Sequence, residues 1–159
     1  MKKTTHILFT IYIFLVIWII LFKLSVSIDQ LPHFRSINLI PFYYPNKTGF
    51  QIREVLDNLI IFIPFGLYLK TLNINSERTV FLGFLLSLSL ELSQYIFCIG
   101  ASDITDLIGN TLGSGVGAVL FAFLGKILPK KRMSMINGIG AVVEVVGIAL
   151  LSMLFVTNK

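Results

Sequence analysis

Apolar residues occur in long blocks along this chain, separated by short segments in which polar residues and prolines gather. A membrane-spanning helix needs about 20 mostly apolar residues, and five blocks reach or approach this length. They cover approximately residues 7–26, 52–70, 79–99, 104–124 and 135–156. The pattern predicts an all-α polytopic membrane protein, folded as a compact bundle of about five transmembrane helices.

The first block has a second interpretation, as a signal peptide that is removed after export. Lys2 and Lys3 precede it, and the small residues Ser25 and Ser27 resemble a cleavage site. Its apolar run is longer than the roughly 7–15 residues of a signal-peptide core. We therefore expect it to remain as a transmembrane helix.

The region between the first and third blocks is less regular. Residues 29–51 contain three prolines among several aromatic side chains. Prolines disfavour a regular helix and aromatic residues favour the headgroup layer, so we expect an extracytoplasmic interfacial or re-entrant loop. The second block is the weakest of the five, because Asp57 and Asn58 interrupt it and Pro64 removes a backbone N–H donor.

Composition supports a membrane protein and excludes two other classes. Apolar residues make up 55% of the chain and charged residues 13%, whereas soluble domains contain about 25% charged residues. A soluble domain of 159 residues cannot bury so much apolar surface, and disordered chains are polar and poor in aromatic residues. We expect a single membrane domain over residues 1–159.

The basic residues predict the orientation of the chain. In membrane proteins Lys and Arg gather on the cytoplasmic side and contact anionic lipid, so the net charge of +5 indicates membrane lipids rather than nucleic acid as partners. With a cytoplasmic N-terminus, eight basic residues lie inside and five outside, and four of the eight fall in residues 126–132. We therefore predict a multi-pass protein of the plasma membrane with its N-terminus in the cytoplasm and its C-terminus outside.

Polar residues inside the predicted helices indicate where a binding site would form. A charged residue at the centre of a span costs roughly 2.5–3.5 kcal/mol on insertion scales, so such residues usually face the protein interior or water. At a rise of 1.5 Å per residue, polar residues of the second, third and fourth blocks lie about 7–12 Å below the extracytoplasmic ends of those blocks. They are Asp57, Asn58, Glu91, Gln94 and Asn110, with Asp106 one turn nearer the surface. This coincidence predicts an outward-facing polar pocket within the membrane.

The spacing of these residues also places them on shared helix faces. Glu91 and Gln94 are three positions apart and therefore adjacent on their helix. Asp103, Asp106 and Asn110 follow the spacing of a single helical stripe. The polar residues of the third and fourth blocks can thus converge.

A ladder of small residues follows the same helix. Gly109, Gly113 and Gly117 form a GxxxGxxxG pattern, which allows a neighbouring helix to approach closely. The pattern predicts helix packing, either within one chain or in a homo-oligomer.

Simpler roles for the polar residues remain open at this stage. The carboxylates and amides can link helices through interhelical hydrogen bonds, and Asp103 can cap the fourth helix, because Asp favours helix N-termini. Asp57 and Asn58 can stand at the start of a helix. Glu144 has no polar neighbour on its own helix, so it either pairs across the bundle or faces lipid in the protonated form.

Four segments carry a family resemblance. Residues 35–42, 58–66, 91–94 and 103–113 read RSINLIPF, NLIIFIPFG, ELSQ and DITDLIGNTLG, and in this order and spacing they resemble the VanZ family. The resemblance implies a VanZ-like core over residues 35–125, with residues 135–156 as an additional C-terminal helix. It also implies a membrane protein of Gram-positive bacteria that lowers susceptibility to teicoplanin and related lipoglycopeptides.

The resemblance also implies which residues carry the function. Family-typical polar positions fall on Arg35, Asn38, Asn58, Glu91, Gln94, Asp103, Asp106 and Asn110. Together with Asp57 from the polar layer, these residues form the predicted ligand-binding set.

Three functions fit these observations. We favour a non-enzymatic protein whose pocket engages a lipid-linked cell-wall precursor or the lipid tail of a lipoglycopeptide. The alternative is an intramembrane enzyme that modifies a lipid or envelope precursor, with Glu91 and Asp106 as an acid–base pair or as ligands of Mg²⁺ or Ca²⁺. An ion-coupled transporter using Glu91 and Glu144 is less suited to a chain without an internal repeat. Two histidines and the single Cys98 cannot complete a zinc site. For the favoured function we expect neither a metal nor a cofactor.

Overall fold

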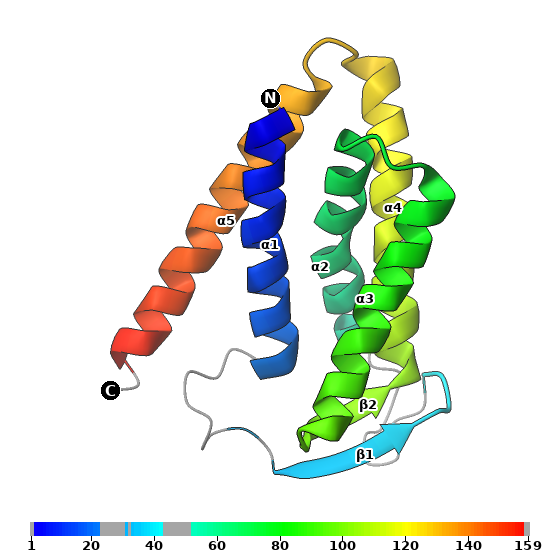
Figure 1. Ribbon diagram of the computed structural model, residues 1–159, viewed down its shortest axis with the longest axis vertical. Coiled ribbons are helices and arrows are strands. Elements are labelled where there is room, and N and C mark those ends of the chain that lie inside the picture. Colours follow the sequence, from blue (N-terminus) through cyan, green and yellow to red (C-terminus); the bar gives the residue numbers. More distant parts are fainter. Residues whose placement is uncertain (1, 23–30, 32, 43–51, 158–159) are drawn as a thin grey trace.

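A computed structural model of the chain describes residues 2–22, 31, 33–42 and 52–157. Its helices are α1 (Lys2–Phe22), α2 (Ile52–Thr71), α3 (Ser76–Ile96), α4 (Ile104–Ile127) and α5 (Arg132–Thr157). They form a bundle (Figure 1), which confirms the predicted all-α membrane class. Each helix begins and ends within a few residues of the apolar block that predicted it.

Four of the described helices are long and apolar enough to cross a membrane, namely α1, α3, α4 and α5. α2 is not among these four, in keeping with its interrupted apolar block, and it carries Pro64 within the helix. The N-terminus and the connection between α4 and α5 lie at one end of the bundle (Figure 1), and the two strands lie at the other end.

α2 packs tightly against α4 because small residues line their contact. A side chain at Gly113 would overlap the carbonyl oxygen of Leu59, and one at Gly117 would overlap that of Ile63. On the α2 side, a side chain at Gly66 would overlap the carbonyl oxygen of Ser114. The glycine ladder of α4 is thus occupied by α2 of the same chain, so a homo-oligomer would need another surface.

A small parallel sheet closes the end of the bundle opposite the N-terminus. Strand β1 (Phe34–Asn38) pairs with β2 (Ile99–Asp103) so that Asn38 lies opposite Asp103. The sequence pattern predicted only a loop over 29–51 and assigned residue 99 to the third helix, which instead ends at Ile96. Residues 23–30, 32 and 43–51 of the predicted loop lie outside the described residues.

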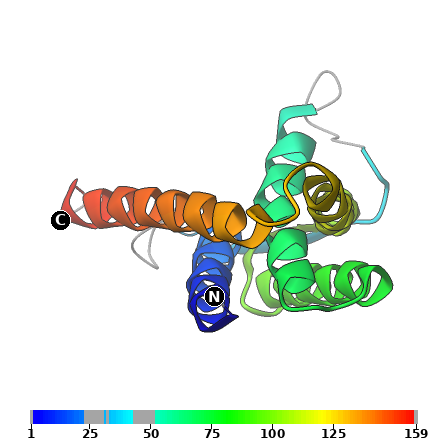
Figure 2. The ribbon, with the colours of Figure 1, turned by 90° about the horizontal axis from the view of Figure 1, so that it is seen from above.

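α5 is the least buried of the apolar helices. Its buried residues are Ile136, Asn137 and Glu144. Figure 2 shows α5 extending away from the group formed by α2, α3 and α4, with α1 beside its first turns. The buried hydroxyl of Thr5 in α1 donates a 3.1 Å hydrogen bond to Asn137 Oδ1, which ties the two helices together.

Candidate functional site

Asp103 joins three elements at the sheet end of the bundle. One oxygen of its carboxylate accepts a 2.7 Å hydrogen bond from the backbone N–H of Thr105, so Asp103 caps the N-terminus of α4. The other oxygen accepts a 2.9 Å bond from the Asn38 side-chain amide of β1. The backbone N–H of Asp103 donates to the carboxylate of Glu91 in α3 over 2.9 Å. The capping role considered for Asp103 is thus present, and Asp103 also contacts Glu91 of the third block and Asn38 of β1.

A second contact joins α2 to α4 at the same end. The side-chain amide of Asn58 donates a 2.6 Å hydrogen bond to Asp106 Oδ1. Both residues are partly exposed, and Asp106 lies one turn beyond Asp103 on α4. We call Asn38, Asn58, Glu91, Asp103 and Asp106 the polar cluster.

Asn110 and Gln94 are buried and form separate links. Asn110 is almost fully buried and donates a 2.9 Å hydrogen bond from its amide to the hydroxyl of Ser87 in α3. Gln94 donates from its amide to the carbonyl oxygen of Ile20 in α1 over 3.0 Å. These residues link α3 to its neighbours on both sides, which is the interhelical role weighed for them in the sequence.

Arg35 and Asp57 lie on the surface at the same end. The guanidinium of exposed Arg35 stands 5.3 Å from the centre of the Tyr95 ring, a cation–π contact. The side chain of Asp57 is 59% exposed and its carboxylate lies 3.7 Å from Arg53 on the same helix. Asp57 thus forms a surface ion pair, whereas Asn58 turns inward to Asp106.

Serine and threonine hydroxyls complete the site and were not singled out from the sequence. The hydroxyl of Ser102 donates a 2.6 Å hydrogen bond to the backbone carbonyl of Glu91. Buried Thr105 accepts a 2.9 Å bond from the backbone N–H of Phe42. Such residues are common throughout this chain, so only their tertiary contacts distinguish them.

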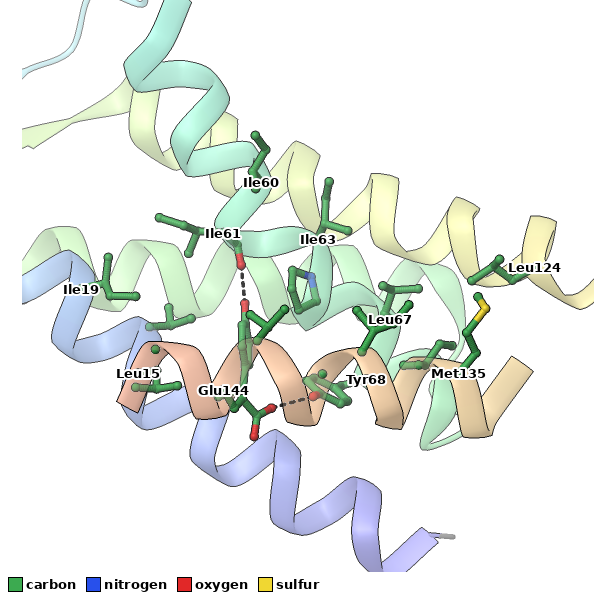
Figure 3. Close-up of a pocket in the computed structure, with 18 residues that line it drawn as sticks. Leu15, Ile19, Ile60, Ile61, Ile63, Leu67, Tyr68, Leu124, Met135 and Glu144 are labelled. Atoms are coloured by element: carbon green, nitrogen blue, oxygen red, sulfur yellow. Dashed lines mark hydrogen bonds between the residues drawn. The ribbon is translucent and has the colours of Figure 1, made fainter. Parts of the chain in front are cut away.

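Glu144 lies away from the polar cluster, beside an apolar cavity of about 470 Å³ between α1, α2 and α5. Figure 3 shows the hydroxyl of Tyr68 directed at its carboxyl group, and the Tyr68 O–H donates a 2.6 Å bond to Glu144 Oε1. Of the two alternatives for Glu144, pairing across the bundle is the one observed. Tyr12 lines the same cavity and donates to the carbonyl oxygen of Ile61 over 2.7 Å.

The acid–base pair considered for an enzyme contacts two different partners. Glu91 accepts from the amide of Asp103, and Asp106 accepts from Asn58. Within the described part of the chain, three or more His, Cys, Asp or Glu side chains do not come together in a group that could hold a metal ion. The hydrogen bonds of the polar cluster link β1, α2, α3 and the start of α4 at the sheet end of the bundle.

Comparison with known proteins establishes the family. A family model described as VanZ/LLP1 matches residues 9–125. The chain belongs to the VanZ/LLP1 family. It is also 42% identical over 156 residues to Protein VanZ of Enterococcus faecium, a match that covers 94% of this chain and 89% of that protein. No solved structure matches the chain.

The family match and the four apolar helices together identify a membrane protein. The matched residues contain the whole polar cluster and begin within α1, ahead of the predicted core at residue 35. α5 lies beyond them and carries Glu144. The polar cluster is thus part of the VanZ/LLP1 region, and Glu144 is contributed from outside it.

Proposed function

We propose that this chain lowers bacterial susceptibility to teicoplanin and related lipoglycopeptides from within the plasma membrane. Its ligand is a lipid-linked envelope precursor or the lipid tail of the antibiotic, bound at the sheet end of the bundle. Membership of the VanZ/LLP1 family and the 42% identity to Protein VanZ support the resistance function.

The proposal places the polar cluster on the extracytoplasmic side. Lys126, Lys130, Lys131 and Arg132 lie at the connection between α4 and α5, at the end of the bundle opposite the sheet. Basic residues gather on the cytoplasmic side of membrane proteins, so this end faces the cytoplasm together with the N-terminus. Lipoglycopeptides act outside the membrane, where the polar cluster would meet them.

One observation carries the proposal: polar side chains from β1, α2, α3 and α4 meet beside an exposed apolar segment. β1 and the residues after it expose Phe34, Ile37, Leu39, Ile40 and Phe42. Binding sites for small amphiphilic molecules combine apolar walls with a few polar groups that set orientation. The amides and carboxylates of the polar cluster, half-buried except for buried Glu91, suit the hydroxyl and amide groups of a lipid headgroup, and the exposed apolar segment suits its hydrocarbon chain.

The test compares single carboxylate-to-amide changes in cells that express the full chain. Glu91→Gln and Asp106→Asn keep the side-chain shape but alter the hydrogen bonds of the polar cluster, so we expect both to lose teicoplanin resistance. Glu77→Gln makes the same chemical change at an exposed residue in the first turn of α3, outside the predicted ligand-binding set, and should retain resistance. The measurement is the minimum inhibitory concentration of teicoplanin, with membrane abundance of each variant determined by immunoblot. Unchanged resistance in both cluster variants would remove the polar cluster from the mechanism.

A further inference from the structure

The cavity between α1, α2 and α5 has the size and lining of a binding site for a hydrocarbon chain. Its volume of about 470 Å³ lies within the roughly 300–1,000 Å³ of small-molecule sites. Apolar side chains form most of its wall, among them Leu15, Ile63, Leu67 and Ile139. Figure 3 shows Leu124 and Met135 together at one end of the cavity, with Ile19 and Ile60 toward the other.

The carboxyl group of Glu144 interrupts this apolar lining, as do the hydroxyl groups of Tyr12 and Tyr68. The residue is 4% exposed, and its Oε1 accepts the hydrogen bond from Tyr68. Its Oε2 is buried and has no hydrogen-bond partner among the described residues. Among the described residues that line the cavity there is no Lys, Arg or His. Buried polar atoms in proteins are nearly always paired, and an ionisable residue inside a membrane usually marks a functional site.

Glu144 also lies near the middle of α5. It is 12 residues from Arg132 and 13 from Thr157, the two ends of α5, which places it about 18 Å from one end and 20 Å from the other. Any group that meets Oε2 must therefore enter the hydrocarbon core together with an apolar carrier.

A hydroxyl group satisfies these conditions best. It donates a hydrogen bond to an ionised carboxylate and accepts one from a protonated carboxyl group, so it can pair with Glu144 in either form. An ammonium group would bring a full charge to the centre of the bilayer, which is costly. A purely hydrocarbon ligand would leave the carboxyl oxygen unpaired.

We propose that this cavity binds a lipid alcohol, with the hydroxyl group at the Glu144 carboxyl and the aliphatic chain running toward Met135. Met135 and Glu144 are nine positions apart, or about 13–14 Å along the helix, and Met135, Ile136, Ile139, Gly140 and Val143 line the cavity over this length. The site is separate from the polar cluster, so each can be tested without the other.

The experiment photolabels the full-length protein in phosphatidylcholine vesicles. The probe is a long-chain alkanol that carries a diazirine near its methyl end, and labelled positions are mapped by mass spectrometry of peptides. We expect saturable labelling at the end of the cavity near Leu124 and Met135. Unlabelled alkanol should compete for this labelling, and an alkane of the same chain length should not.

Two substitutions and one control decide the outcome. Glu144→Leu removes the polar group, and the apparent affinity for the alkanol should fall about fivefold or more, as expected for one lost hydrogen bond. Ile139→Trp should abolish labelling by filling the cavity while Glu144 is retained. Val145→Leu is the control: it changes an exposed side chain of α5 that does not line the cavity, and this variant should still bind the alkanol. Equal competition by the alkane, or unchanged saturable labelling in Glu144→Leu, would overturn the proposal.

Size-exclusion chromatography checks that each variant is folded. If Glu144→Leu does not fold, Ile139→Trp still tests the site.

Discussion

The carboxylate of Asp103 serves two structural purposes at once. One oxygen caps α4 through the N–H of Thr105, and the other holds β1 through Asn38. The first contact is local, between residues two positions apart, and the second joins residues that are 65 positions apart. A single side chain thus couples the start of a helix to the placement of the sheet.

Substitutions at Asp103 should separate these two contributions. Asp103→Ser retains a good N-cap and loses the reach to Asn38, whereas Asp103→Ala loses both. We expect the free energy of unfolding to fall by about 1–3 kcal/mol in Asp103→Ala, and by less in Asp103→Ser. Thermal unfolding of the purified proteins in detergent measures the order of their stabilities. Equal stability of Asp103→Ala and the unsubstituted protein would show that neither hydrogen bond matters.

At the scale of elements, α2 depends on α4 more than on its own hydrophobicity. α2 is not among the helices whose length and apolar character alone suit a membrane span. Its backbone lies so close to α4 that side chains at Gly113 or Gly117 would overlap its carbonyl oxygens. Close packing and van der Waals contact drive helix association in lipid, so this contact, the most extensive that α2 makes, contributes most to holding α2 in the bundle.

Alanine substitutions along α4 should test this contact. Gly113→Ala places a methyl group against the Leu59 carbonyl and 2.9 Å from Phe62 Cβ, and we expect a loss of about 1–3 kcal/mol from overpacking. Gly115→Ala meets only Val80 Cγ2 at an ordinary distance of 3.6 Å. It should be neutral or slightly stabilising, because Ala favours a helix over Gly. Comparable melting temperatures of the two variants in detergent would contradict the tight α2–α4 contact.

At the scale of the whole molecule, the two ends of the bundle differ in chemistry. The end near the N-terminus carries the basic connection between α4 and α5, and the opposite end carries the sheet and the polar cluster. The N-terminus and the end of α5 lie toward opposite ends (Figure 1). This asymmetry motivates the proposed orientation.

Thiol labelling in intact cells should reveal the orientation. The single cysteine is first replaced by Cys98→Gly, which suits the φ of 56° at this position. A new cysteine is then introduced by Leu39→Cys or by Lys131→Cys. A membrane-impermeant maleimide should label position 39 in intact cells, and position 131 only after the membrane is permeabilised. The reverse pattern would place the polar cluster in the cytoplasm and refute the proposed function.

The elements of this fold followed largely from local sequence, and their contacts did not. Each predicted apolar block corresponds to a helix, and the cap at Asp103 lies at the predicted start of α4. The pairing of β1 with β2 was missed, because it joins five-residue strands far apart in the chain and neither has an alternating pattern of its own. The sequence also did not predict which of Asp57 and Asn58 faces the bundle. Adjacent residues on a helix point in different directions, and only the rotation of α2 against α4 decides between them.

The sequence by itself determined the membrane class, the number and approximate limits of the helices, and the VanZ resemblance that the family match confirmed. These properties depend on the length of apolar runs and on the cost of polar groups in lipid, both of which are read along the chain. Only the tertiary structure decided that Asp103 meets Asn38, that the glycines of α4 meet α2, and that Glu144 meets Tyr68 beside a cavity. Such contacts depend on how each helix is rotated and tilted against its neighbours, and that is set by the packing of all the helices together.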